Sequence, residues 1–473
     1  MRPKLVIIGN GLATGRLLDG LMARGGVEAF DIHVYGEEPH GLYNRILIGR
    51  LLGGGTVDEI TLKPVDWYAE NGITFHCGVL IDRLDTVAKV AITSDGTIQP
   101  YDRAVFATGS RAFIPPLVGL LGEDGRPKAG VLVFRTLDDG HRIRDRARAG
   151  QHAVVLGGGL LGLEAAKSLS DLGMQVSVIQ RSDTLMDQQV DEVGGLFLRK
   201  SIEQLGIGVI PGVKEIGIVG SEQVEGVTLG DGRTLTANLL VLACGIRPRI
   251  DSAAASGLTL GRGILVDDHL GTSARGVYAV GECAEHDGQV YGIVEPIWQQ
   301  CDVLADLITG ADPGARYLGS KPYTRLKVAG VGVASMGLVR PSEEDDEVIQ
   351  IIEERSGTYR KLIIRHDRLV GAVLIGETGA SPDLARWLDR GDPLPANRID
   401  VLCSGGSYSS APDPEVCNCH HVRESTIVAS IRGGKTTVGQ VSDSTRAGTG
   451  CGSCRVQITR LLGTHAPTDA ALA

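Results

Sequence analysis

The sequence predicts an α/β protein built around two strand–glycine-turn–helix units, followed by a small α+β domain and a small helical domain. Three observations carry this prediction. One buried apolar run opens into Gly9-Asn10-Gly11, and a second opens into Gly157-Gly158-Gly159. Near the C-terminus, four cysteines form two close pairs after a stretch rich in Ser, Gly and Pro. Each glycine turn therefore predicts a Rossmann-like dinucleotide-binding domain, and the cysteines predict a metal site.

The first glycine turn follows residues 5–8, which have the length and apolar character of a buried strand. Gly9 permits the tight turn, and Gly11 lets the backbone approach a pyrophosphate. A helical pattern from Leu12 would present free N–H groups and a partial positive charge to that anion. The predicted dinucleotide contacts are Gly9, Gly11, Leu12, Ala13 and Thr14, with Thr14 in place of the third glycine of the fingerprint.

Three further stretches extend this first site. Residues 31–37 form a predicted strand that ends in Glu37, which either binds a ribose hydroxyl or is a surface acid. Arg45 is either a pyrophosphate contact or a solvated arginine. Residues 103–107 form a strand ending in Ala107-Thr108-Gly109, a turn of small residues whose N–H groups would face a cofactor.

The second glycine turn contains all three glycines of the fingerprint. Its predicted contacts are Gly157, Gly159, Leu160, Leu161 and Gly162. The next strand, residues 175–179, ends in Gln180-Arg181 rather than in an acid. Arg181 either meets a 2′-phosphate or is a surface arginine, so the residues leave the choice between NADH and NADPH open. A later buried strand leads to Gly245, which we also expect near this nucleotide.

The rest of the chain carries one more strand-to-turn stretch and then changes pattern. Residues 276–282 lead to Gly281-Glu282, where the carboxylate would accept a hydrogen bond from a sugar-alcohol hydroxyl or cap a helix. Residues 316–403 read as alternating strands with one helix, and residues 404–414 read as a linker.

Composition excludes several classes of partner. The 473 residues carry a net charge of −10, which argues against a nucleic-acid or anionic-membrane surface. No apolar run approaches the ~20 residues of a membrane span, and no signal peptide is recognisable, so we expect a soluble, cytoplasmic protein. In a reducing compartment, clustered cysteines indicate a metal rather than disulfides.

The cysteine cluster consists of Cys417 and Cys419, separated by one residue, and Cys451 and Cys454, separated by two. Both pairs lie among turn-forming residues, and each precedes a predicted helix. Thiolates at helix N-termini gain from nearby N–H donors and from the helix dipole. Four thiolates hold either a 2Fe–2S cluster or Zn²⁺, and the spacing alone does not decide between them.

The order of these motifs resembles the two-dinucleotide-binding-domain flavoprotein family over residues 1–315. The resemblance implies FAD at the first turn, at residues 107–109 and at Gly281-Glu282, with NAD(P)H in an inserted domain that makes the FAD domain discontinuous. Relatives usually have Asp where Glu282 stands, and ferredoxin reductases place a lysine near the flavin where Arg50 stands. Arg50 and Glu164 are therefore candidates for residues near the flavin, and no residue is assigned a catalytic role.

A narrower resemblance covers residues 37–45, 185–191 and 281–286, which look like the N-terminal half of the NADH-dependent nitrite reductase large-subunit family. The cysteine pairs resemble that family's bacterioferritin-associated-ferredoxin-type 2Fe–2S domain. No siroheme-binding half follows, an arrangement that resembles the electron-transfer subunits of assimilatory nitrate reductases. The implied domains are residues 1–130 (FAD, first part), 131–246 (NAD(P)H), 247–315 (FAD, second part), 316–403 (α+β), 404–414 (linker), 415–463 (2Fe–2S) and 464–473 (tail).

The resemblance implies an oxidoreductase that passes electrons from NADH through FAD and a 2Fe–2S cluster to a protein acceptor. The expected acceptor is the catalytic chain of an assimilatory nitrate or nitrite reductase. Relatives mostly use NADH, so we expect NADH as donor, with NADPH as the alternative. A second hypothesis is an NADH-dependent reductase of ferredoxin or rubredoxin that serves another oxidase. A third is a non-catalytic redox sensor.

Overall fold

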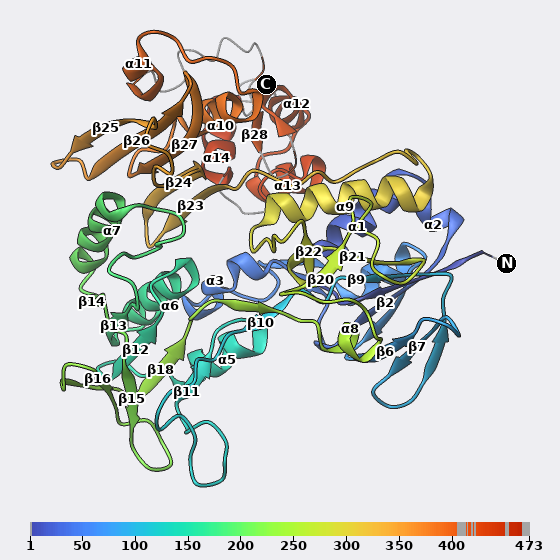
Figure 1. Cartoon of the computed structure of the whole chain (residues 1–473), viewed down its shortest axis with the longest axis horizontal. Helices are drawn as coiled ribbons and strands as arrows, with labels where there is room; N and C mark the ends of the chain where they lie inside the picture. The colour runs from blue at the N-terminus through green and yellow to red at the C-terminus, as the bar shows by residue number, and fades with distance from the viewer. Residues whose placement is uncertain are drawn as a thin grey trace, which may run out of the picture. The chain divides into compact units, whose positions relative to one another are not determined.

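The computed structural model describes residues 2–403, 413, 415–417, 420, 422–449 and 454–465 (Figure 1). These residues fall into two compact units, each assembled from segments that are distant in the sequence. The first unit comprises Met1–Leu47, Thr56–Ala112 and Ile246–Ser320, and the second comprises Ile48–Gly55, Phe113–Gly245 and Lys321–Ala473.

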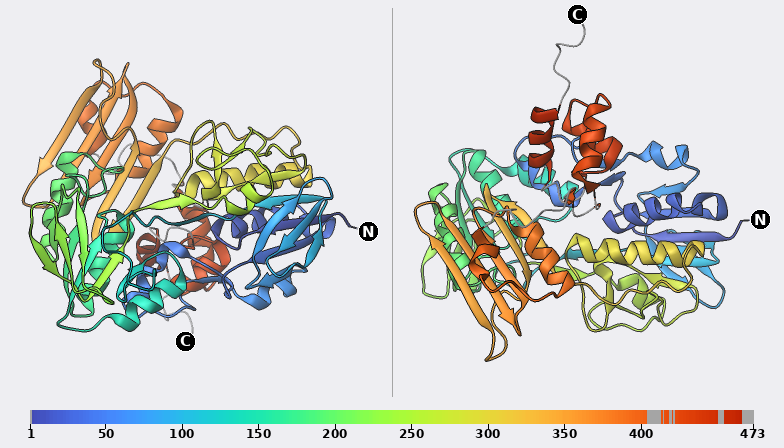
Figure 2. Two further views of the ribbon diagram at one scale, coloured as in Figure 1. Left: turned by 60° about the horizontal axis from the view of Figure 1, so that its bottom comes forward. Right: turned by 90° about the horizontal axis from the view of Figure 1, so that it is seen from above.

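The first unit contains a five-stranded parallel sheet. Its strands, in spatial order, are β21 (Val277–Ala279), β9 (Arg103–Phe106), β1 (Lys4–Ile8), β2 (Asp31–Gly36) and β5 (Thr74–Cys77). The central strand β1 is apolar because Leu5, Val6 and Ile7 are completely buried. The helices α1 (Leu12–Ala23) and α9 (Val294–Thr309) pack side by side (Figures 1 and 2). Because β21 and α9 follow the second glycine turn in the sequence, the first unit is formed from segments on both sides of that turn.

Smaller elements surround this sheet. An antiparallel sheet contains β6 (Ile81–Asp85), β7 (Val90–Thr93) and β8 (Ile98–Pro100). Three strand pairs are β3 (Leu42–Tyr43) with β4 (Thr61–Lys63), β10 (Ser110–Ala112) with β19 (Ile246–Pro248), and β20 (Ile264–Val266) with β22 (Ala284–His286). The short helices are α2 (Gly26–Ala29), α4 (Val65–Glu70) and α8 (Asp251–Ala255).

The second unit contains its own five-stranded parallel sheet. Its strands, in spatial order, are β11 (Val131–Val133), β18 (Leu239–Leu242), β12 (His152–Leu156), β13 (Gln175–Ile179) and β14 (Gly208–Ile210). The accompanying helices are α3 (Gly49–Leu52), α5 (Leu137–Arg146), α6 (Leu160–Asp171) and α7 (Glu192–Gln204), and the strands β15 (Ile216–Val219), β16 (Gly226–Leu229) and β17 (Thr234–Thr236) form a small antiparallel sheet. Thr136 begins α5 with a capping box to Asp139, which fixes where that helix starts.

An antiparallel sheet follows in the same unit. Its strands, in spatial order, are β23 (Tyr323–Val328), β24 (Val331–Gly337), β27 (Arg368–Ile375), β26 (Thr358–Arg365) and β25 (Glu347–Glu353). The amphipathic helix α10 (Ser381–Arg390) covers one face through Leu384 and Leu388 (Figure 2). This helix ends at Gly391, whose φ of 62° is the left-handed conformation typical of a helix end. The helix α11 (Arg398–Cys403) follows.

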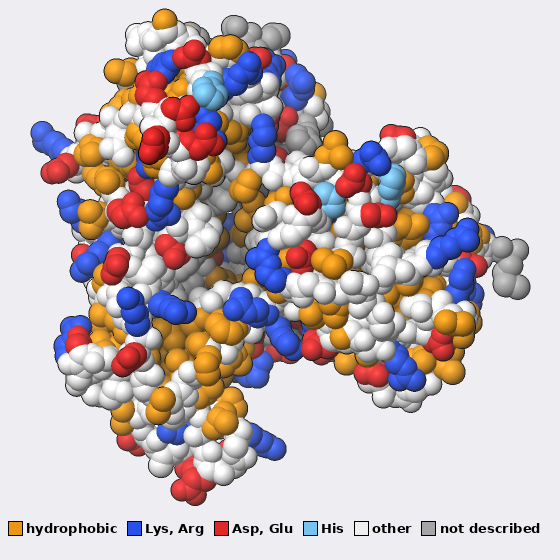
Figure 3. All heavy atoms as spheres, in the orientation of Figure 1, with side chains coloured by type: hydrophobic (Ala, Val, Ile, Leu, Met, Phe, Trp, Pro, Cys, Tyr) orange, Lys and Arg blue, Asp and Glu red, His pale blue; other side chains and the backbone are white. Residues whose placement is uncertain are grey.

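The last elements are mostly helical, as the sequence predicts. They are a hairpin of β28 (Glu415–Cys417) and β29 (Val422–Arg423), and the helices α12 (Glu424–Arg432), α13 (Val438–Thr445) and α14 (Arg455–His465). Ile427, Val441 and Ile458 form a small core of their own among the helices. No helix in these described ranges has both the length and the apolar character needed to cross a bilayer. Acidic and basic side chains lie among one another over the face shown in Figure 3.

Candidate functional site

The first glycine turn has the geometry of a nucleotide cradle. Gly9 has φ +108°, and a Cβ placed there would lie 2.2 Å from the carbonyl oxygen of Ala107. A Cβ placed at Gly11 would meet nothing within 4 Å. The N-cap residue Gly11 offers no side chain to the first N–H groups of α1, so these groups are open to a ligand. The fold therefore requires the first glycine, and the second leaves room that fits a pyrophosphate.

The turns at residues 107–109 and 281–282 lie around this first turn. A Cβ at Gly281 would lie 3.1 Å from the Cβ of Ala13. The backbone N–H of Gly281 donates to Gln300 Oε1 over 2.9 Å. Glu282 Oε2 accepts a hydrogen bond of 2.6 Å from the hydroxyl of Ser110. The structure thus brings together three predicted stretches that are widely separated in the sequence.

Glu37 and Arg45, also predicted for this site, have charged partners. Glu37, directly after β2, forms an ion pair with Arg249. Thr108 Oγ1 donates to the carbonyl oxygen of Arg249 over 2.6 Å, which ties that arginine to the Ala107–Gly109 turn. Arg45 forms an ion pair of 2.6 Å with Glu38. Sequence reasoning missed Arg249, because it follows Glu37 by more than two hundred positions.

Asn10, inside the first glycine turn, is held by a buried tyrosine that sequence reasoning also missed. The Tyr68 hydroxyl donates to Asn10 Oδ1 over 2.6 Å, and burial raises the pKa of that hydroxyl. Asn10 Nδ2 is buried and has no hydrogen-bond partner among the described residues. A buried amide without an acceptor costs free energy, so a bound ligand that supplies an acceptor would be favoured here.

The second glycine turn repeats the geometry of the first. Gly157 has φ +118°, and a Cβ there would lie 2.2 Å from the carbonyl oxygen of Ala243. A Cβ at Gly159 would meet nothing within 4 Å, and neither would one at Gly245. A Cβ at Gly162 would lie 1.9 Å from the carbonyl oxygen of Gly157. Leu160 and Leu161 begin α6, so this turn also opens a helix N-terminus to an anion.

Gln180 and Arg181 follow β13 but have different roles in the fold. Gln180 is buried, and its Oε1 accepts a hydrogen bond of 2.8 Å from the N–H of Gly158. Its Nε2 donates to Ser182 Oγ over 2.7 Å. Arg181 is exposed and makes no hydrogen bond or ion pair with another residue in the described part of the chain. Gln180 therefore stabilises the glycine turn, and Arg181 is available to a ligand.

Arg50 and Glu164 lie close together within the second unit. Glu164 Oε2 lies 3.4 Å from the position of a Cβ at Gly49, next to Arg50. Burial raises the pKa of the Glu164 carboxyl to about 7, although the positive charge of Arg50 acts in the opposite direction. The carboxyl group therefore exchanges its proton near neutral pH.

We expect Glu164→Gln to flatten the pH dependence of stability. The pKa of the Glu164 carboxyl is about 7 in the folded protein, against an ordinary value of 4.5. Between these pH values the unfolded chain ionises more readily than the folded protein, so the wild-type protein loses about 3 kcal/mol of unfolding free energy as pH rises. The neutral amide cannot ionise, so the variant keeps that free energy. Chemical denaturation from pH 4 to pH 8 measures the unfolding free energy of both proteins. Glu203→Gln, at an exposed position on α7, is the control. Parallel curves for wild type and Glu164→Gln would contradict the prediction.

Two of the four predicted metal ligands lie in the described part of the chain. Cys417 and Cys454 are both buried and belong to the same apolar cluster of the helical domain. Cys454 directly precedes α14, as the sequence predicts. Cys419 and Cys451 lie outside the described residues. Two buried thiols brought together from distant segments fit a thiolate-held metal centre.

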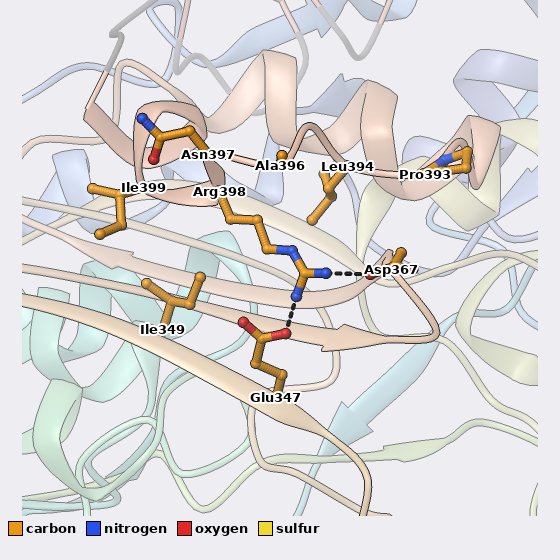
Figure 4. Close-up of a pocket in the computed structure, with 9 residues that line it drawn as sticks. All are labelled: Glu347, Ile349, Asp367, Pro393, Leu394, Ala396, Asn397, Arg398 and Ile399. Atoms are coloured by element: carbon orange, nitrogen blue, oxygen red, sulfur yellow. Dashed lines mark hydrogen bonds and ion pairs between the residues drawn. The ribbon is translucent and has the colours of Figure 1, made fainter.

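A separate hollow of about 630 Å³ lies beside the edge strand β25 (Figure 4). Arg398 extends across it between Glu347 and Asp367 and forms an ion pair with each. Because two carboxylates compensate this arginine, the hollow does not favour a phosphate. None of the predicted site residues lines it.

The comparisons with known proteins agree with this geometry. A family model described as pyridine nucleotide-disulphide oxidoreductase matches residues 3–302, which include both glycine turns. The chain belongs to this family. Further models match residues 322–392, as a rubredoxin NAD+ reductase C-terminal domain, and residues 415–464, as a BFD-like [2Fe-2S] binding domain.

Similar proteins share nearly the whole chain. A nitrite reductase [NAD(P)H] of Bacillus subtilis is 37% identical over 98% of this chain and 57% of its own length. The assimilatory nitrate reductase electron transfer subunit of the same organism is 36% identical over 98% of this chain and 59% of its own length. The solved ferredoxin reductase from Rhodopseudomonas palustris is 23% identical, covers 85% of this chain and 100% of its own, and has a TM-score of 0.73. This chain thus spans somewhat more than half the length of the two curated relatives.

These findings confirm the predicted fold class. They also confirm the prediction that the protein is an oxidoreductase that uses FAD, NAD(P)H and a 2Fe–2S cluster. The choice of iron–sulfur over zinc, open from spacing alone, follows from the match at residues 415–464. The individual cofactor contacts and the domain boundaries stay predictions.

Proposed function

We propose that this protein transfers electrons from NADH, through FAD and a 2Fe–2S cluster, to the catalytic part of an assimilatory nitrate or nitrite reductase. The observation that carries the proposal is the alignment of 98% of this chain with an assimilatory nitrate reductase electron transfer subunit. When bound at the first glycine turn, FAD would supply the chemistry that converts two-electron hydride transfer from NADH into single-electron transfer, and a cluster held by the four cysteines would supply one-electron transfer.

In this proposal the first unit binds FAD. The open space at Gly11 and the N–H groups of α1 receive the pyrophosphate. Glu37 binds the ribose, exchanging its ion pair with Arg249 for the sugar hydroxyls. Glu282, oriented by the Ser110 hydroxyl, accepts a hydrogen bond from the ribityl chain.

The second unit binds the nicotinamide nucleotide at the Gly157–Gly162 turn. Gly159 leaves the space for its pyrophosphate. Arg181, which follows β13 closely, faces the ribose. In the same unit, the Glu164 carboxyl beside Arg50 holds or releases a proton at Oε near neutral pH.

The helical domain holds the cluster through Cys417, Cys419, Cys451 and Cys454. The burial of Cys417 and Cys454 supports this assignment, because a thiolate-held cluster is protected by an apolar environment. We also propose a cytoplasmic location, since thiolate ligands persist in a reducing compartment.

Acceptor kinetics test the proposal. The purified protein should show flavin and iron–sulfur absorption that NADH bleaches under anaerobic conditions. It should then reduce the catalytic chain of an assimilatory nitrate reductase faster than it reduces rubredoxin. Faster reduction of rubredoxin would favour the second candidate, an NADH-dependent rubredoxin reductase, which the domain match at residues 322–392 supports.

A further inference from the structure

Residues 184–191 connect the second glycine turn to the five-stranded antiparallel sheet (β23–β27) of the same unit. At one end, the backbone N–H of Met186 donates to the carbonyl oxygen of Gly158 over 3.0 Å. A Cβ at Gly158 would lie 2.4 Å from Leu185 Cδ2, so the segment packs directly against the turn. Met186 has φ +49°, a conformation that costs a non-glycine residue free energy unless its surroundings enforce it.

Arg340, just after β24, holds the middle of this segment. Its Nη1 donates to the carbonyl oxygen of Asp187 over 3.0 Å, and its Nη2 donates to that of Val190 over 3.3 Å. Its Nε donates to Glu192 Oε1 over 2.9 Å. One planar guanidinium therefore fixes two backbone carbonyls and the first residue of α7, which a lysine could not do.

A buried charged group holds the far end of the segment. Asp191 Oδ2 accepts hydrogen bonds of 2.7 Å from Lys361 Nζ and of 2.7 Å from the Tyr359 hydroxyl. Asp191 Oδ1 caps α7 by accepting from the N–H of Gly194 over 3.0 Å. The side chains of Asp191 and Lys361 are only 3% and 5% exposed, so neither charge has water as an alternative partner.

Apolar packing completes this connection. The helix α7 lies against β26 and β27 (Figure 1). The ring of Phe197 on α7 stacks on that of Tyr359, with centroids 6.1 Å apart. The segment and the start of α7 are thus held by the sheet through charge, hydrogen bonds and packing.

We propose that the antiparallel sheet is a positioning element for the nicotinamide nucleotide, with Arg340, Lys361 and Tyr359 holding residues 184–191 and, through them, the Gly157–Gly159 turn. The inference rests on the proposed function, because it assumes that this turn binds NAD(P)H. A turn that is already fixed before binding spends less of the binding free energy on ordering. Arg340, Lys361 and Tyr359 act on the nucleotide only through residues 184–191, so they are positioning residues.

Arg340→Gln tests the inference in the full-length holoenzyme. Its matched control is Arg365→Gln, which removes an arginine from the same sheet that pairs with Asp346 instead. The affinity for NAD+ is measured by calorimetry, and the exchange of backbone amides is measured at residues 157–162 and 184–191. Turnover at saturating NADH with ferricyanide gives the maximal rate.

We expect Arg340→Gln to weaken NAD+ binding by about fivefold to tenfold, with faster amide exchange in both stretches and little change in maximal rate or FAD content. Tyr359→Phe keeps the packing on Phe197 and should have a smaller effect of the same kind. Arg365→Gln should behave as wild type.

An unchanged NAD+ affinity in Arg340→Gln would overturn the inference, and so would a loss of maximal rate at unchanged affinity. Equal weakening in Arg365→Gln would also overturn it, because any loss of charge on the sheet would then suffice. The proposed function fails separately, when the wild-type protein neither binds NAD+ nor is reduced by NADH.

Discussion

Replacing Cys454 with serine should abolish electron delivery to a protein acceptor while NADH oxidation with a dye continues. Cys454 is buried in the same apolar cluster as Cys417, so a solvent molecule cannot readily take its place. A serine hydroxyl stays protonated at neutral pH and is a poor ligand for iron. We expect the rate with the protein acceptor to fall by about 100-fold or more, because the cluster is lost or altered.

Iron analysis, electron paramagnetic resonance and acceptor kinetics on one preparation measure this effect. Cys77→Ser serves as the control, because Cys77 lies in the parallel sheet of the first unit and outside the cysteine cluster. The control should retain both the cluster signal and electron delivery. If the Cys454→Ser protein still delivers electrons at the wild-type rate, the cluster is not on the route.

The second large effect concerns Gly159→Val, which should prevent reduction by NADH without unfolding the protein. Gly159 has extended backbone angles, φ −81° and ψ 179°, that valine adopts readily. Its side chain would enter the open space beside the turn rather than strike the protein. We therefore expect NADH affinity to fall by about 100-fold and the unfolding free energy to change by less than about 1 kcal/mol.

Gly162→Ala should instead destabilise the fold, which separates a loss of stability from a loss of nucleotide binding. A Cβ at Gly162 would lie 1.9 Å from a backbone oxygen, which must move. We expect a loss of about 3 kcal/mol in unfolding free energy. Stopped-flow reduction by NADH and chemical denaturation of both variants separate the two effects. Normal reduction of Gly159→Val by NADH would place the nucleotide elsewhere.

The local parts of the fold could be predicted from the sequence, because their signals lie within a few residues. The apolar runs that open into Gly9 and Gly157 predict buried strands, and the structure has β1 (Lys4–Ile8) and β12 (His152–Leu156) there. The positive φ of Gly9 and Gly157 explains why glycine marks both turns. The juxtaposition of Ser110 with Glu282 follows from sheet topology and has no local signal.

The contacts that sequence reasoning missed join residues far apart in the chain. Arg249 pairs with Glu37, and Tyr68 holds Asn10, because strands β1 and β2 bring distant loops to one edge of the sheet. Lys361 and Asp191 meet in the second unit because α7, which Asp191 caps, packs against β26 and β27. A single sequence contains no periodic or spacing signal for such pairs. The roles of the individual cofactor contacts stay predictions for the same reason.

The position of Gln180 has a consequence for coenzyme engineering. The preference for NADH or NADPH is commonly changed at the residue that follows the second strand of a dinucleotide-binding domain. Here that residue bonds to the N–H of Gly158 and is buried, so an acid introduced at Gln180 would disturb the loop before it met any ribose. Redesign of coenzyme selectivity in this protein must therefore begin at the exposed neighbour, Arg181, and leave the glutamine in place.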